Sequence, residues 1–166
     1  MKKVGVIVAV TGFMMLSSGI GRITAVPVAA AAGGSKTFFA VLGGGQVLPP
    51  VAPAFPGSAV GVAEMTFNES TKLLCYAISY TGLVGAETAA HLHTPAGIGV
   101  NAPAVITISG GGPPPPGPSP LGSPKTGCVP LSNQQAGDLE RGLFYFQLHS
   151  TAFPPGEIRG QVLPVR

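Results

Sequence analysis

Short apolar segments separated by glycine and proline run through most of the chain, and this spacing constrains the fold more than any other feature. Seven segments are rich in β-branched, aromatic or other apolar residues and are bounded by Gly, Pro, Asn or Ser: residues 37–42, 58–67, 72–80, 89–94, 104–108, 143–150 and 157–163. Gly and Pro supply 25 and 18 of the 166 residues, so turns are frequent and long helices are not expected. The pattern predicts an all-β domain, a two-layer β-sandwich of about seven strands.

Residue alternation within these segments separates core positions from surface positions. In residues 72–80 both faces are largely apolar, so this strand is expected near the centre of a sheet. In residues 143–150 one face carries Phe144, Phe146 and Leu148, and the opposite face carries Tyr145, Gln147 and His149. We therefore expect the phenylalanines in the core and His149 directed away from it.

One short helix is expected over residues 132–141. Ser132 can cap its first turn, Gln135 stands three residues later as a capping box requires, and Gly142 is placed to end it. Residues 110–127, just before this segment, are nearly all Gly, Pro, Ser or Thr and contain almost nothing apolar to bury. That composition predicts a mobile surface loop.

Residues 1–33 indicate an export signal. Lys2 and Lys3 precede an apolar run over residues 4–21, and small residues around Ala32 offer a cleavage point. Glycines and Arg22 interrupt this apolar part, which disfavours the alternative of a permanent membrane anchor. We expect a secreted, periplasmic or cell-surface protein with one domain over residues 34–166 and no stable membrane span once the signal is removed.

Removal of the signal changes the charge of the protein. The whole chain has a formal net charge of +3, but Lys2, Lys3 and Arg22 leave with the signal, and the remainder has equal numbers of basic and acidic residues. A neutral domain lacks the basic surface that phosphate backbones require, so nucleic acid is excluded as a partner. The expected partner is an extracytoplasmic protein or a metal ion.

Cys75 and Cys128 are the only cysteines in the sequence. An exported chain enters an oxidising compartment, so we expect these two residues to form a disulfide. The closed loop of about fifty residues would stabilise the fold by roughly 4 kcal/mol on the chain-entropy model. The alternative is two buried free thiols; zinc ligation by this pair is disfavoured because close Cys-x-x-Cys spacing is missing.

The three histidines of the chain are the main candidates for chemistry. His91 and His93 are two residues apart in an expected strand and project from the same face, and His149 joins them if its strand lies beside theirs. Three neutral imidazoles with an open fourth position suit Cu or Zn. In the structural alternative, each ring nitrogen hydrogen-bonds a backbone carbonyl, Tyr145 or the Glu157 carboxylate. A shared ion requires the ring nitrogens to lie within about 4 Å of one another.

Glu157 and Arg159 share a strand face and admit two interpretations. In the first, they form an ion pair with each other or with a neighbouring strand. In the second, Glu157 orients a ligating histidine and Arg159 recruits an anion. The chain has no serine elbow, no phosphate loop and no acid–base pair of diagnostic spacing, so its residues alone do not predict catalysis.

Several ordered motifs resemble the chordin-type CHRD domain family. They comprise an opening apolar strand with a Gln-Val-Leu-Pro-Pro-Val turn, the stretch around Cys75, an Ala-His-Leu-His segment followed by Pro-Ala-Gly, and a closing pair that includes Pro-Gly-Glu-Ile-Arg-Gly-Gln. Val47 stands where the family has an acidic residue. The resemblance implies an immunoglobulin-like or Greek-key β-sandwich or barrel, and an exported non-enzymatic module with a binding or structural role.

The histidine arrangement also partly resembles the copper centre of copper/zinc superoxide dismutases. In that family a His-x-His strand and a distant strand histidine converge, and Arg159 resembles its late arginine. This resemblance implies a copper redox enzyme as the alternative function. The chain has only three histidines, so the bridging histidine and the zinc loop of a dismutase have no counterpart. The first hypothesis is therefore a CHRD-type module that coordinates copper or zinc through its three histidines.

Overall fold

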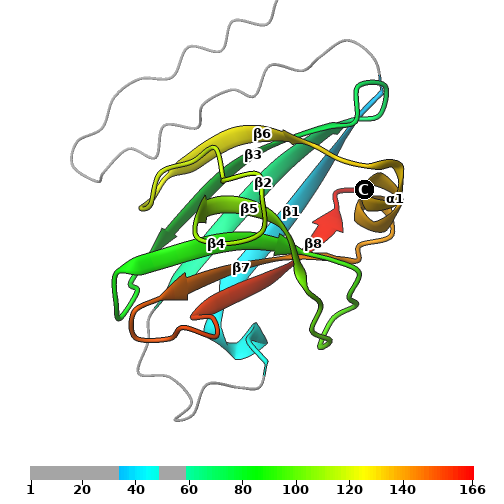
Figure 1. The fold of residues 1–166 in the computed structure, drawn as a ribbon. Helices are drawn as coiled ribbons and strands as arrows, with labels where there is room; N and C mark the ends of the chain where they lie inside the picture. Colours follow the sequence, from blue (N-terminus) through cyan, green and yellow to red (C-terminus); the bar gives the residue numbers. More distant parts are fainter. Residues whose placement is uncertain (1–33, 49–58) are drawn as a thin grey trace, which may run out of the picture.

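Eight antiparallel strands form one curled sheet with the order β5-β4-β7-β8-β1-β2-β3-β6 (Figure 1). The computed structural model describes residues 34–48 and 59–166, so the expected export signal lies outside the described residues. The strands are β1 (Ser35–Gly43), β2 (Val60–Asn68), β3 (Leu73–Thr81), β4 (Glu87–His93), β5 (Ala104–Gly110), β6 (Lys125–Pro130), β7 (Phe144–Ser150) and β8 (Ile158–Pro164). The described ranges also contain a 3-10 turn, η1 (Gly44–Gln46), and one helix, α1 (Asn133–Glu140). The all-β prediction is confirmed.

The seven expected strands are present, and β6 is an additional strand that the sequence pattern did not predict. It contains Gly127 and ends at Pro130, and both residue types are depleted from strands. β6 tolerates them because it lies at an edge of the sheet and pairs only with β3. The expected loop at residues 110–127 must therefore be shortened, because it ends where β6 begins at Lys125.

The hydrophobic core fills the inside of the curled sheet. Buried residues from both halves of the sheet join one cluster, in which Phe38, Ile78, Phe144 and Phe146 are fully buried. The alternation predicted for β7 is confirmed, since its phenylalanines belong to this cluster and His149 does not. The outer face of β7 is therefore free to carry polar side chains.

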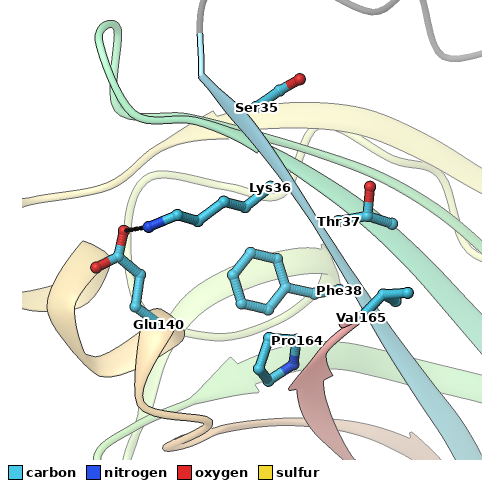
Figure 2. A pocket seen from close by; sticks show the side chains of 7 residues that line it. All are labelled: Ser35, Lys36, Thr37, Phe38, Glu140, Pro164 and Val165. Carbon is cyan, nitrogen blue, oxygen red and sulfur yellow. Dashed lines mark hydrogen bonds and ion pairs between the residues drawn. The ribbon is translucent and has the colours of Figure 1, made fainter.

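Helix α1 begins and ends as its sequence predicts. The Ser132 side chain accepts a hydrogen bond from the Gln135 backbone N–H and the Gln135 side chain accepts one from the Ser132 backbone, which completes the capping box. Gly142 follows with a φ of 70°, the left-handed conformation that glycine adopts without strain. The helix lies beside the C-terminal end of the chain (Figure 1), and the Lys36 ammonium in β1 reaches Glu140 at 2.8 Å (Figure 2).

No helix in the part of the chain that the structure describes has the length and apolar character needed to cross a membrane.

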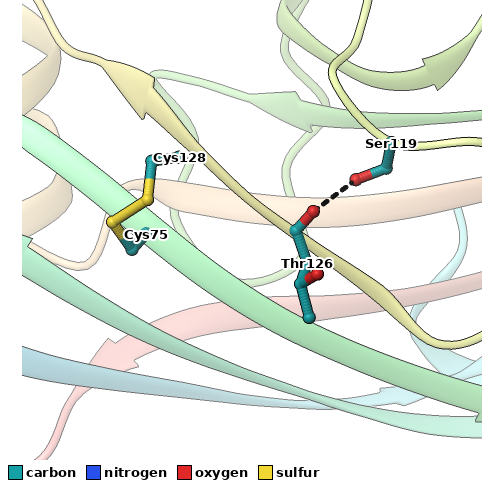
Figure 3. Close-up of a disulfide and its surroundings, with 4 residues drawn as sticks. All are labelled: Cys75, Ser119, Thr126 and Cys128. Atoms are coloured by element: carbon teal, nitrogen blue, oxygen red, sulfur yellow. Dashed lines mark hydrogen bonds between the residues drawn. A yellow bond between two sulfur atoms is a disulfide. The ribbon is translucent and has the colours of Figure 1, made fainter. Parts of the chain in front are cut away.

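The expected disulfide between Cys75 and Cys128 is formed (Figure 3). The two cysteines are directly paired partners of β3 and β6. The bond therefore fastens the edge strand β6 to the rest of the sheet.

Ser119 bridges the two edge strands of the sheet. Its backbone N–H donates to the Ile108 carbonyl of β5 at 3.0 Å, and its hydroxyl donates to the Thr126 carbonyl of β6 at 3.0 Å (Figure 3). The Tyr76 hydroxyl lies 2.9 Å from the same Ser119 hydroxyl. The Gly/Pro-rich connection thus closes the gap between β5 and β6 at this point.

A buried ion pair joins β4 and β6, which lie near opposite ends of the strand order. The Lys125 ammonium of β6 lies 2.7 Å from the Glu87 carboxylate of β4, and both side chains are almost completely buried. Glu87 also accepts hydrogen bonds from the hydroxyls of Tyr80 and Ser109 and from the backbone N–H of Gly122. This network satisfies both charges within the protein, as buried ions require.

Candidate metal centre

The three histidines meet on the outer face of two neighbouring strands. β4 pairs with β7 in a register that places His93 opposite Tyr145 and Ala89 opposite His149. Because side chains alternate along each strand, all three rings project from the same surface. His91 and His93 are each 8% exposed and His149 is half-buried, although none of them faces the core.

The potential ligand nitrogens of His91, His93 and His149 all lie within 4.8 Å of one another. His91 Nδ1 and His149 Nε2 lie 3.2 Å apart. The separation of 4.8 Å exceeds the limit of about 4 Å between ring nitrogens that is expected for a shared ion. Tetrahedral coordination with metal–nitrogen bonds of about 2.0–2.1 Å places ligand nitrogens about 3.4 Å apart, so a separation of 4.8 Å must contract by about 1.4 Å when an ion binds.

Each imidazole has one nitrogen within hydrogen-bond distance of a backbone carbonyl. The pairs are His91 Nε2 with Gly111 at 2.6 Å, His93 Nδ1 with Ala102 at 2.9 Å, and His149 Nδ1 with Pro154 at 2.9 Å. A carbonyl oxygen can only accept, so the nitrogen facing it carries the ring hydrogen. In the neutral rings the opposite nitrogens, Nδ1 of His91 and Nε2 of His93 and His149, are therefore left as lone-pair acceptors.

These free nitrogens lack hydrogen-bond donors. His93 Nε2 is buried and has no hydrogen-bond partner, and the close contact between His91 and His149 joins two acceptors when both rings are neutral. Burial lowers the pKa of His93 to about 4 and also lowers the pKa of His149, so protons do not fill Nε2 of these two rings at neutral pH. A cation is the species that would satisfy all three lone pairs at once.

Tyr145 supports His93 in two ways. Its ring stacks on the His93 ring with centroids 4.5 Å apart and an interplanar angle of 8°. Its hydroxyl donates to the Ala102 carbonyl at 3.0 Å, the same oxygen that accepts from His93 Nδ1. Tyr145, which was expected as a hydrogen-bond partner of the histidines, thus stacks on His93 and shares the Ala102 carbonyl with it as a hydrogen-bond acceptor.

Arg159 lies against the same tyrosine. Its guanidinium carbon is 3.5 Å from the centroid of the Tyr145 ring, and the residue is only 2% exposed. Nη1 donates to the Asn101 side chain at 2.8 Å and Nη2 donates to the Val100 carbonyl at 2.6 Å. Arg159 therefore holds the loop that follows β4, and these donors point to that loop instead of to an ion site.

Glu157 forms neither of the contacts expected from the sequence. Its Oε1 accepts a hydrogen bond from the Val84 backbone N–H at 2.6 Å, and its Oε2 is buried without a partner. Neither an ion pair with Arg159 nor a hydrogen bond to a histidine is present among these described residues. The expectation fails because Glu157 precedes β8 and points to the β3–β4 connection, whereas Arg159 is within β8.

Backbone groups and a glycine complete the site, and sequence reasoning missed them. A Cβ added to Gly112 would lie 2.3 Å from His91 Nε2 and 2.6 Å from the Thr107 hydroxyl, so this position has no room for a side chain. The carbonyls that fix the rings belong to three separate loops and have no side-chain signature. Gly112 itself sits in a run of three glycines, which hides its individual role.

Comparison with known families gives one match. The model of the CHRD domain matches residues 38–162. Neither the curated proteins nor the solved structures include a match to the chain. The matched range contains all three histidines and both cysteines.

Proposed function

The chain belongs to the CHRD domain family, and from this premise we propose that it is an exported, non-enzymatic module that binds one copper or zinc ion through His91, His93 and His149. The observation that carries the proposal is the convergence of three imidazole lone pairs that lack donors, in rings whose opposite nitrogens are hydrogen-bonded to carbonyls. Such carbonyl contacts are the usual means by which proteins orient metal-binding histidines.

The donor set supports copper or zinc. Three neutral imidazoles supply borderline nitrogen ligands, which suit these two metals better than calcium or magnesium. No further histidine, cysteine or acidic residue joins this cluster among the described residues. The fourth position is left to water or to a small ligand, as in other three-histidine sites.

Two further features support the remaining parts of the proposal. The Cys75–Cys128 disulfide fits a protein that folds in an oxidising compartment, which agrees with an export signal over residues 1–33. Arg159 donates its hydrogen bonds to Asn101 and Val100, an arrangement that supports a structural role over recruitment of an anionic substrate. The site therefore favours binding over dismutation.

Calorimetric titration of the metal-free protein with Cu(II) and with Zn(II) tests the proposal. We expect one ion per chain for the wild type and no stoichiometric uptake for a His91→Ala/His93→Ala double variant. Glu64→Gln is the matched control because it removes an exposed carboxylate from β2, outside the histidine cluster. Absence of uptake by the wild type, or unchanged uptake by the double variant, would refute the metal site.

A further inference from the structure

Arg159 is a buried cation that forms no ion pair with any carboxylate in the described part of the chain. It is 2% exposed, and the ion pairs found among the described residues involve Lys36, Lys125 and Arg141 only. Arg159 donates its hydrogen bonds to a side-chain amide and a backbone carbonyl, which are neutral acceptors. The positive charge of Arg159 is therefore not cancelled by a direct contact with a carboxylate.

The Tyr145 ring separates this charge from the metal centre. The strand order β4-β7-β8 places Tyr145 between His93 and Arg159. His93 and the guanidinium lie 4.5 Å and 3.5 Å from the Tyr145 ring centroid, and two groups this close must occupy opposite faces of the ring. The guanidinium therefore lies within about one Debye length of the His93 ring, and protein instead of solvent fills the space between them. Salt screens a buried charge at this distance only weakly.

The charge that lies against the Tyr145–His93 stack is the positive charge of Arg159. The three imidazoles are neutral ligands, and the Glu87 carboxylate is paired with Lys125. The Glu157 carboxylate accepts a hydrogen bond from the Val84 backbone N–H and keeps its own negative charge, and it forms no ion pair with Arg159. The Arg159 charge repels an ion at the site, and this contribution is twice as large for a divalent ion as for a monovalent ion at the same position.

We propose that Arg159 makes the three-histidine centre selective for Cu(I) over Cu(II) and Zn(II). The inference rests on the proposed function, because it assumes that copper binds at this centre. Imidazole ligands accept both oxidation states of copper, so ligand type alone does not decide between them. Arg159 acts through its charge, without contacting the metal. Its effect is on binding equilibria only.

The reduction potential of the copper-loaded protein tests this inference. Arg159→Met removes the charge while keeping an unbranched side chain over Tyr145. We expect the ratio of Cu(I) to Cu(II) affinity to fall about tenfold, which lowers the potential of this one-electron couple by about 59 mV. Arg141→Met is the matched control because it removes the same charge from an exposed side chain paired with Asp138, and its potential should equal that of the wild type.

The outcomes separate this inference from the proposed function. If Arg159→Met binds one copper ion with an unchanged potential, the selectivity role is overturned and the metal site stands. If the wild type binds no copper, the metal site and the inference both fail. If Arg159→Met does not fold, Arg159→Lys, which retains the charge, should keep the wild-type potential. The wild-type potential should then also exceed that of copper in excess aqueous imidazole, and a value at or below this reference contradicts the inference.

Discussion

His91 and His149 face each other across β4 and β7 with Nδ1 and Nε2 3.2 Å apart. Each ring also has its other nitrogen against a backbone carbonyl, at Gly111 for His91 and at Pro154 for His149. The carbonyls assign the ring hydrogens to the outer nitrogens, so two acceptors meet at the centre of the pair. The sheet register brings the two rings together. The loop carbonyls determine which nitrogen of each ring faces the other ring.

The tautomers of the histidines in the metal-free protein follow from these contacts. We expect His91 to carry its hydrogen on Nε2, and His93 and His149 to carry theirs on Nδ1. Two-dimensional ¹H–¹⁵N correlation spectra of the imidazole rings at neutral pH measure this directly. Hydrogens on the inner nitrogens instead would mean that the rings bond one another, and would support the structural alternative.

Two adjacent glycines offer a matched test of the space around His91. An alanine at Gly112 places its Cβ 2.3 Å from His91 Nε2, whereas an alanine at Gly111 meets nothing within 4 Å. Gly112→Ala should displace His91 or its loop and weaken metal binding about 10-fold or more, the effect typical of lost outer-shell support. Gly111→Ala should bind as the wild type does. Equal affinities in the two variants, measured by competition with a chromophoric chelator, would show that the contact is unimportant.

The Glu87 network predicts loss of stability in acid. Burial alone raises the pKa of Glu87, but hydrogen bonds from Lys125, Ser109 and Tyr80 outweigh burial and hold the pKa below its ordinary value of 4.5. Because the folded pKa is the lower one, the stabilisation is present above the unfolded pKa and is lost as pH falls through the folded pKa. The thermal midpoint of unfolding should therefore decline below about pH 4.5.

Paired substitutions attribute this acid sensitivity to the network. Glu87→Gln alone leaves the Lys125 ammonium buried and unpaired, which should cost about 3–5 kcal/mol of unfolding free energy. The Glu87→Gln/Lys125→Met double variant removes the charge as well and should recover part of that loss. Chemical denaturation as a function of pH should show a shallower acid decline in the double variant. An identical decline in the wild type and the double variant would assign the effect to other carboxylates.

The disulfide should make a large contribution to stability. Cys75 and Cys128 are 53 residues apart in sequence, and a loop of this length corresponds to roughly 4 kcal/mol on the chain-entropy model. A Cys75→Ser/Cys128→Ser variant should lose about this amount in urea denaturation at neutral pH. A loss below about 1 kcal/mol would indicate that Ser119 and the Glu87 network hold β6 in place without the bond.

The fold was predictable from local patterns wherever those patterns were strong. Alternation in residues 143–150 assigned Phe144 and His149 to opposite faces, and the capping residues located α1. Strand β6 escaped prediction because Gly127 and Pro130 weaken its strand signal, and only its pairing with β3 at the sheet edge offsets them. The pairing of Glu87 with Lys125 depends on how the sheet curls, which no local pattern encodes.

The candidate site was predictable only in part. The i, i+2 spacing of His91 and His93 fixed a common face, and the neighbouring position of β7 added His149. Arg159 was expected either to pair with a carboxylate or to recruit an anion, but it stacks on Tyr145 and donates hydrogen bonds to Asn101 and Val100 in the loop after β4. That arrangement, like the carbonyl contacts of the rings, depends on how loops fold over the sheet. Loop positions arise from long-range packing, so the sequence pattern does not determine them.

Anomalous X-ray diffraction from zinc-soaked crystals of the protein tests the metal site most directly. A single anomalous peak is expected about 2.0–2.1 Å from Nδ1 of His91 and from Nε2 of His93 and His149. An empty histidine cluster at saturating zinc would contradict the proposal and leave these residues as hydrogen-bonding supports of their loops.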